Sequence, residues 1–256
     1  MIFRTRFAGG IVAEFAPPAS GDRQAPVIML CDGMPSMPRK QPLVEWLAAK
    51  DYWVIYPRWR GAWESEGDFL AQSPERDLSD ILDALPGGMR ESAFGRRFAP
   101  RPRNVFVIGG SFGGAAAILS TLDRRVTAAV ANCPVVDWSI LDSEQRKETS
   151  NPSYAAYIRE AFGAGYRLSA RNWNRLKTGR FFNPAARVAE LDGGKLLLFH
   201  AQDDPYVPWR GVERFARQAG CRLKLLERGG HLSTDRTARR YWRSIAAFFA
   251  RAARSD

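Results

Sequence analysis

The stretch between Val105 and Gly114 reads VFVIGGSFGG, an apolar run followed by four glycines around a serine and a phenylalanine. An Ala-rich segment follows, which gives the order strand, sharp turn, helix. The glycines flanking Ser111 have GxSxG spacing, which suits a turn where side chains would collide with the strand and the helix. We expect the Ser111 hydroxyl to project from the carboxyl edge of a sheet. The Phe112 amide would then face an anion from a helix N-terminus. The alternative is a glycine-rich turn with an incidental serine.

Short apolar runs alternate with amphipathic segments of helical length on both sides of this stretch. The expected strands are 2–7 and 11–15, joined as a hairpin, then 27–31, 52–56, 105–108, 127–132, 196–199 and 223–226. The expected helices are 42–50, 74–85, 112–122, 212–219 and 235–254. This alternation predicts an α/β fold with a mostly parallel central sheet and helices on both faces. We interpret residues 1–256 as a single domain of this kind.

Residues 138–190 interrupt the alternation, because they have helical spacing, aromatic residues and charges but no clear strand. The segment is long enough for two or three helices. In α/β enzymes such an excursion after a strand often covers the site. We therefore expect it to form a helical cap insertion.

The composition of this 256-residue chain is that of an ordinary globular protein, with 45% hydrophobic and 25% charged residues. Disordered, collagen-like and coiled-coil classes are therefore excluded. The chain has no apolar run of membrane-spanning length and no basic-then-apolar leader, so we expect a cytoplasmic protein and no membrane partner. Its three cysteines are far apart, which argues against a disulfide framework and a thiolate metal site. With no metal or nucleotide motif, we expect no cofactor and no metal.

The net charge of +11 comes from 38 basic residues, mostly arginines scattered along the chain. No zinc-finger, RNP or helix-turn-helix pattern accompanies the charge, so we expect no nucleic-acid partner. Between residues 159 and 187 the sequence has seven basic side chains and one acidic side chain, Glu160. If this part of the cap overhangs Ser111, its field would favour anionic or neutral substrates. Arginines on an outer, solvated face would have no such effect.

A serine nucleophile needs a neighbouring base, usually an imidazole held by a carboxylate. The sequence has only two histidines. His231 follows the last expected strand and precedes the terminal helix, where a base belongs, whereas His200 ends a strand and is interpreted as structural. Asp203 and Asp204 both follow that strand on a loop at the same edge. Either aspartate could supply the carboxylate, and the other would face solvent or cap the loop.

The chain order of serine, aspartate and histidine is that of the α/β-hydrolases. The segment HAQDDPYVP, from His200 to Pro208, resembles the HGxxDxxVP signature of the prolyl-oligopeptidase-like members of that superfamily, with Ala201 in place of the glycine. The resemblance implies that Asp204 is the catalytic acid. The triad would then be Ser111, Asp204 and His231.

Two further loops resemble the superfamily. CDGMP at residues 31–35 lies where many members have HGxP, and this implies an oxyanion-hole amide at Met34 beside that of Phe112. Asp32 stands in the histidine position, and Gly33 is a rival donor and a candidate substrate contact. Residues 57–69 resemble the RGxGxSxG loop of X-prolyl dipeptidyl peptidases. That loop implies a substrate entrance near Trp59 and Trp63, and the alternative is a structural loop tied down by Arg60 and a local acid.

Together these observations predict a serine hydrolase, either an esterase or a peptidase. It would cleave a carboxylic ester or a peptide bond through an acyl-enzyme intermediate. The expected substrate is a small ester or a short peptide. Two alternatives remain at this point: an acyltransferase with an acceptor other than water, and a non-catalytic binding protein on the same scaffold.

Overall fold

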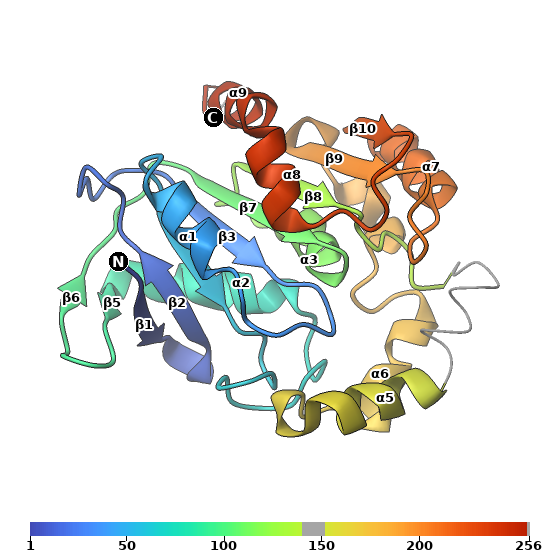
Figure 1. Ribbon diagram of the computed structural model, residues 1–256, viewed down its shortest axis with the longest axis horizontal. Coiled ribbons are helices and arrows are strands. Elements are labelled where there is room, and N and C mark those ends of the chain that lie inside the picture. Colours follow the sequence, from blue (N-terminus) through green and yellow to red (C-terminus); the bar gives the residue numbers. More distant parts are fainter. Residues whose placement is uncertain (140–151, 255–256) are drawn as a thin grey trace.

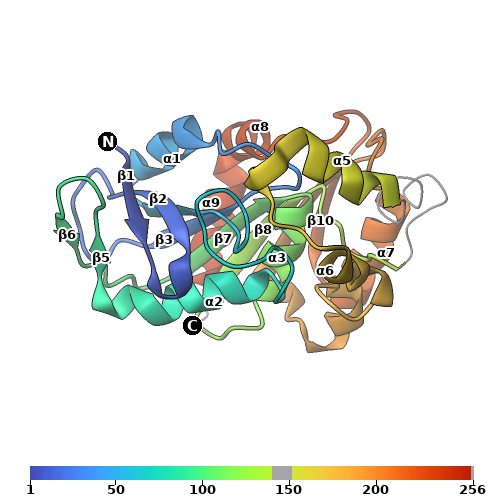
Figure 2. The ribbon, with the colours of Figure 1, turned by 90° about the horizontal axis from the view of Figure 1, so that it is seen from below.

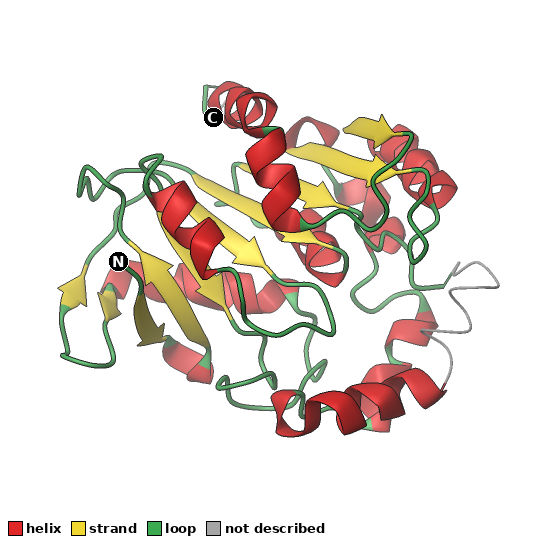
Figure 3. Cartoon of the chain, in the orientation of Figure 1, coloured by secondary structure: helices red, strands yellow, loops and turns green. Residues whose placement is uncertain are grey.

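A central sheet of eight strands organises the molecule (Figures 1 and 3). The computed structural model describes residues 1–139 and 152–254. The strand order is β1-β2-β4-β3-β7-β8-β9-β10. Their bounds are β1 Phe3–Arg6, β2 Val12–Ala16, β3 Val27–Cys31, β4 Trp53–Pro57, β7 Val105–Gly110, β8 Ala128–Asn132, β9 Leu196–Ala201 and β10 Arg222–Leu226. Strands β1, β2 and β4 pair antiparallel. From β4 onward in this order, that is β4-β3-β7-β8-β9-β10, neighbouring strands pair parallel. The carboxyl ends of β3, β7, β8 and β9 therefore meet at one edge.

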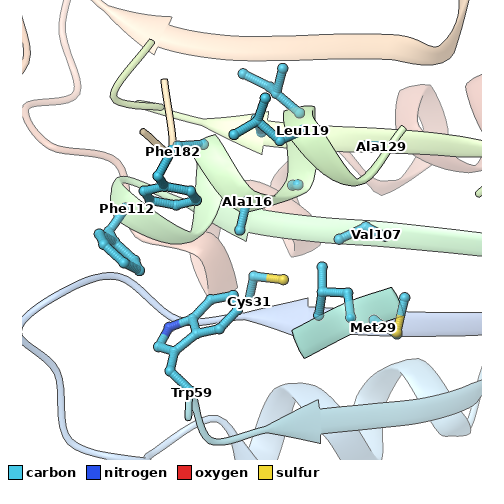
Figure 4. Close-up of a cluster of buried hydrophobic side chains, with 14 of the residues drawn as sticks. Met29, Cys31, Trp59, Val107, Phe112, Ala116, Leu119, Ala129 and Phe182 are labelled. Carbon is cyan, nitrogen blue, oxygen red and sulfur yellow. The ribbon is translucent and has the colours of Figure 1, made fainter. Parts of the chain in front are cut away.

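Helices cover both faces of the sheet, and Figure 2 shows α1 and α2 on opposite sides of it. The longer helices are α1 Gln41–Ala48, α2 Glu75–Ala84, α3 Phe112–Ser120, α7 Trp209–Ala219, α8 Thr234–Arg240 and α9 Trp242–Ala252. Side chains of β3 alternate between two hydrophobic clusters, with Met29 in one and Ile28 in the other. The first cluster packs against α2, α3 and α7 and is drawn in part in Figure 4, whereas the second packs against α1 and α9.

These elements confirm the predicted mostly parallel sheet with a helical layer on each face. Two local features differ from the expectation. The terminal helix is divided at Tyr241, whose backbone is not helical (φ −109°, ψ 19°) and whose ring stacks on Phe199. A small antiparallel ribbon, β5 Met89–Arg90 with β6 Arg97–Phe98, was not predicted, because two-residue strands carry no periodic signal.

The segment expected as a cap contains α5 Pro152–Phe162, α6 Ala170–Asn174 and several 3-10 turns. Residues 140–151 of that expectation lie outside the described part of the chain. Figure 1 shows α5 set apart from the sheet. Two arginines bind this segment to the loop after β4. Arg167 donates to the carbonyl oxygens of Trp63, Ser65 and Gly67, and Arg175 donates to that of Leu70.

In the described part of the chain, the last strand of the sheet, β10, pairs only with β9. Arg222 and Lys224 on this strand are exposed, and the leucines between and after them are half-buried. Among the described residues, no helix is long and apolar enough to cross a membrane.

Candidate active site

Ser111 lies in the sharp turn between β7 and α3 with φ 55° and ψ −120°, a conformation that few non-glycine residues adopt. The surrounding glycines are sterically required. A Cβ atom on Gly109 would lie 2.1 Å from the Gly113 carbonyl oxygen, and one on Gly113 would lie 2.4 Å from that of Asp32. The Ser111 amide donates to the Asn132 carbonyl oxygen at 2.9 Å. The turn is thus fixed to the end of the neighbouring strand β8.

His231 and Asp204 form a hydrogen-bonded pair at the same edge of the sheet. The Nδ1 atom of His231 lies 2.9 Å from Oδ2 and 3.1 Å from Oδ1 of Asp204. Oδ1 also accepts the amides of Tyr206 (2.9 Å) and Val207 (3.1 Å), so the carboxylate is fixed by its own loop. Since Nδ1 donates to the carboxylate, the Nε2 atom of His231 is left to accept a proton.

The electrostatics of Asp204 suit a carboxylate that stays ionised. Burial alone would raise the pKa of Asp204. Hydrogen bonds and charge interaction with His231, together with hydrogen bonds from the Cys133 thiol and the Tyr206 amide, outweigh burial and hold this pKa below its usual value. The pair therefore holds a negative charge that can stabilise a protonated imidazole.

A cavity of about 580 Å³ brings Ser111 and His231 together, because both residues line it. Gly33, Met34 and Phe112, the residues expected around the oxyanion, line the same cavity. The remaining wall includes aromatic and aliphatic side chains, namely Val135, Trp138, Tyr157, Tyr206, Val207 and Leu232.

The loop from Asp32 to Ser36 lies beside Ser111. A Cβ atom on Gly33 would be 3.5 Å from that of Ser111, so the glycine leaves room directly at the serine. Asp32, in the position of the family's histidine, is buried; it accepts the Tyr56 hydroxyl and pairs with Lys40 Nζ at 2.6 Å. These contacts tie the start of the loop to β4 and to the segment before α1.

Trp59 and Trp63, expected near the substrate entrance, bind the same loop from behind. The indole of Trp59 donates to the Asp32 carbonyl oxygen (3.2 Å), and that of Trp63 donates to the Ser36 carbonyl oxygen (3.1 Å). Neither side chain lines the cavity that holds Ser111. The structure therefore places the two tryptophans where they position the loop.

The sequence profile described as the alpha/beta hydrolase family matches residues 37–243 of this chain. The chain belongs to the alpha/beta hydrolase family. A search of curated protein sequences gave no significant match.

Solved structures show the same fold at low sequence identity. DcsB, solved with a substrate analogue, is 16% identical with a TM-score of 0.73, and the match covers 98% of this chain and 99% of that one. An esterase from Pyrococcus furiosus is 17% identical with a TM-score of 0.65, over 98% of this chain and 90% of that one. An acylaminoacyl peptidase from Pyrococcus horikoshii is 15% identical with a TM-score of 0.64, over 97% of this chain and 41% of that longer chain.

Asp203, the rival candidate for the acid of this α/β hydrolase, points to a different partner. Its Oδ1 atom accepts the amides of Gly229 and Gly230, both at 2.8 Å. Asp203 thus caps the loop that carries His231, as the sequence analysis allowed for the aspartate that does not pair with the base.

His200 is fully buried, and its Nε2 atom lies 2.8 Å from the Val207 carbonyl oxygen. Burial lowers its pKa, so the ring is neutral at physiological pH and Nε2–H donates to that carbonyl.

Within the described residues, Cys133, His200 and Asp204 are the group whose ligand atoms lie within 4.8 Å of one another, close enough to hold a metal ion. A metal there would compete with His231 for Asp204.

Asn132 is a site residue that the sequence analysis missed. It is buried at the end of β8 and lines the cavity. Its carbonyl oxygen accepts the Ser111 amide, and its side-chain amide donates to the Leu232 carbonyl oxygen at 2.6 Å. Asn132 therefore links the turn at Ser111 to the loop that carries His231. A polar residue ending an apolar strand at this edge was the available signal.

Arg60 is a structural residue of the loop after β4. It pairs with Asp77 at 3.2 Å and with Asp80 at 2.6 Å. Its guanidinium group also donates to the Gly9 carbonyl oxygen at 2.7 Å. These bonds agree with the alternative in which Arg60 ties down the loop through local acids.

The positive charge of the cap does not reach the cavity wall. None of the seven basic side chains between residues 159 and 187 lines the cavity around Ser111. The cation on that wall is Lys40, and it is paired with Asp32. The described surroundings of Ser111 therefore offer no free cation to an anionic substrate.

Proposed function

We propose that this α/β hydrolase is a serine hydrolase that cleaves a carboxylic ester or a peptide bond through an acyl-enzyme intermediate. One observation carries the proposal: Ser111, in its strained turn, shares a cavity with His231, whose Nδ1 atom binds the buried carboxylate of Asp204. A binding protein on this scaffold would not need all three groups in this arrangement.

In the proposed reaction, Ser111 Oγ attacks the carbonyl carbon of the substrate while His231 Nε2 takes the hydroxyl proton. His231 then gives the proton to the departing alcohol or amine, which leaves the acyl group on Ser111. Water attacks the acyl-enzyme with His231 again as the base, releasing the acid and restoring the serine. Asp204 holds the imidazole in the required tautomer and stabilises its positive charge.

The negative oxygen formed at each step would be bound by the Phe112 amide, at the N-terminus of α3, and by an amide of the Gly33–Met34 loop. Support for this assignment comes from the position of both segments on the cavity wall beside Ser111. We assign the second donor to Met34, with Gly33 as the alternative.

The cavity favours a small neutral substrate. Its volume of about 580 Å³ suits a small ester or a short peptide. Aromatic side chains such as Trp138 and Tyr157 supply apolar surface for the acyl or leaving group, and the Lys40 charge is neutralised by Asp32. Esters and amides use the same groups, so substrate profiling decides between them.

The test is treatment with a fluorophosphonate, followed by peptide mapping of the adduct. We expect a single modification, on Ser111. Ser233→Ala is the matched control, because Ser233 lines the same cavity and should be dispensable for labelling. Label on another serine would refute the assignment. A panel of p-nitrophenyl esters and aminoacyl anilides, with and without an added alcohol acceptor, then separates esterase, peptidase and acyltransferase activities.

A further inference from the structure

A second hollow, of about 400 Å³, lies between the start of α2 and the segment after α6. It shares no lining residue with the cavity around Ser111. Four of its lining residues are arginines: Arg76, Arg175, Arg180 and Arg187. Three of them belong to the basic stretch between residues 159 and 187, and none of the basic side chains of that stretch lines the cavity around Ser111. This hollow is therefore where part of the charge of that stretch gathers.

The four arginines differ in the contacts that hold their guanidinium groups. Arg175 is oriented by its bond to the Leu70 carbonyl oxygen and by stacking on the Phe181 ring, 3.8 Å from the ring centroid. Arg187 forms an ion pair with Glu190. Within residues 1–139 and 152–254, no carboxylate forms an ion pair with Arg76 or Arg180. Two guanidinium groups at this hollow are thus available to a ligand.

Among the described residues that line the hollow, Glu75 is the single acid. Its carboxylate accepts the Ser73 hydroxyl, and burial raises its pKa despite the nearby charges of Arg76 and Arg187. Glu190 already pairs with Arg187, so Glu75 is left to balance three guanidinium groups, which one carboxylate cannot neutralise. Like charges gathered around one hollow repel each other, and a bound anion removes that repulsion.

We propose that this hollow binds the phosphate group of a free phosphate ion or of a phosphorylated small molecule. Guanidinium groups form paired, charge-assisted hydrogen bonds with such an oxyanion. The hollow also has apolar walls, formed by Leu119, Phe181 and Phe182, which suit the carbon part of a phosphate monoester. The inference does not depend on the proposed hydrolase reaction, because no residue of the triad takes part.

Packed aromatic side chains connect the hollow to the turn that carries Ser111. Phe182 lines it and packs on Phe112, with ring centroids 4.7 Å apart (Figure 4). Phe112 carries the amide proposed for the oxyanion. A ligand in the hollow would therefore contact a side chain that supports the catalytic turn.

The experiment is calorimetric titration of the full chain with inorganic phosphate and with phenyl phosphate at an ionic strength of about 0.15 M. The test variant is the double substitution Arg76→Gln and Arg180→Gln. The matched control is Arg159→Gln with Arg171→Gln, which removes the same charge from two exposed positions that do not line the hollow. We expect saturable binding that the test variant weakens at least about tenfold and the control leaves unchanged.

Tighter binding of phenyl phosphate than of phosphate would assign the site to a phosphorylated molecule, and the reverse would assign it to the free ion. Absence of saturable binding in the native chain would overturn the proposal. Equal weakening in both double variants would also overturn it, because the attraction would then follow net charge alone. Fluorophosphonate labelling of Ser111 is compared in the native chain and in both variants. Loss of label in a variant alone would indicate misfolding, and absence of label in the native chain would count against the hydrolase function and not against the phosphate site.

Discussion

The turn around Ser111 and the cap segment differ in what holds them in place: close steric constraints in the first and contacts between distant parts of the chain in the second. The turn is fixed by backbone bonds to the adjacent strand and by glycines that no larger residue can replace. The cap is bound to segments about 100 positions away in the chain, both by arginine side chains such as Arg167 and by backbone bonds between Gly165 or Arg167 and the loop after β4. The serine proposed as the nucleophile thus lies in the part of the molecule whose backbone is fixed by close steric constraints.

Removal of the nucleophile should have the largest effect. Ser111→Ala is expected to lower kcat by about 10⁴ to 10⁶-fold, because the triad acts as a unit. The fold should survive, since alanine is no larger than serine in the turn. Steady-state kinetics on an activated ester and the thermal unfolding midpoint measure the two effects. Substantial turnover in a folded variant would place the chemistry elsewhere.

The two adjacent aspartates should differ sharply. Asp204→Asn is expected to lower kcat/KM by about 10⁴-fold, because the amide holds His231 in the wrong tautomer. Asp203→Asn should cost less than about tenfold, since an amide oxygen can still accept the Gly229 and Gly230 amides. The same activated ester serves for both variants. Equal losses would show that the acid is wrongly assigned.

His200 should affect stability rather than chemistry. His200→Gln is expected to lower the free energy of unfolding by about 1 to 3 kcal/mol at pH 7.5, through loss of its bond to Val207. Because burial lowers the pKa of His200 in the folded state, the unfolded chain binds more protons below a pH of about 6.5. The native chain should therefore lose stability as the pH falls through this range.

The variant lacks His200 and should lose that part of the pH dependence. Urea unfolding at pH 7.5 and 5.5 measures both terms. The nearby ionisable groups are Asp204, which raises the pKa of His200, and His231, which lowers it. A variant that is fully stable but inactive would give His200 a catalytic role.

The positive charge of the cap should have the smallest effect on substrate choice. Its arginines do not line the catalytic cavity, so matched esters bearing a carboxylate or an ammonium group should have a kcat/KM ratio nearly independent of salt. A change of less than about twofold is expected between low and physiological ionic strength. A strong preference for the anionic ester that fades with salt would show that the field of the cap reaches Ser111.

The parts predicted from sequence are those whose residue types are dictated locally. The glycines around Ser111 and the apolar runs of the strands reflect the backbone conformation of their own segments, so the sheet and the sharp strand-to-helix turn at Ser111 were predicted correctly. The pairing of His231 with Asp204 followed from the edge at which parallel strands end and from the motif around His200.

Long-range contacts account for what was missed. The bonds of Trp59 and Trp63 to the loop after β3, and the link from Asn132 to Leu232, join segments far apart in the chain. Nothing in the local sequence specifies the partner in such a contact. The division of the terminal helix at Tyr241 likewise coincides with packing on Phe199, a strand residue more than 40 positions earlier.

The outermost strand β10 has a consequence for the behaviour of the protein in concentrated solution. An edge strand presents unpaired amide and carbonyl groups that another chain can extend into a shared sheet. The next strands of the sheet, β9 and β8, are almost entirely apolar, which would favour such edge-to-edge pairing. Arg222 and Lys224 place two positive charges on this rim, and a second copy approaching edge to edge would bring its own pair against them. The rim thus discourages strand-mediated aggregation of a chain whose interior is rich in aggregation-prone sequence.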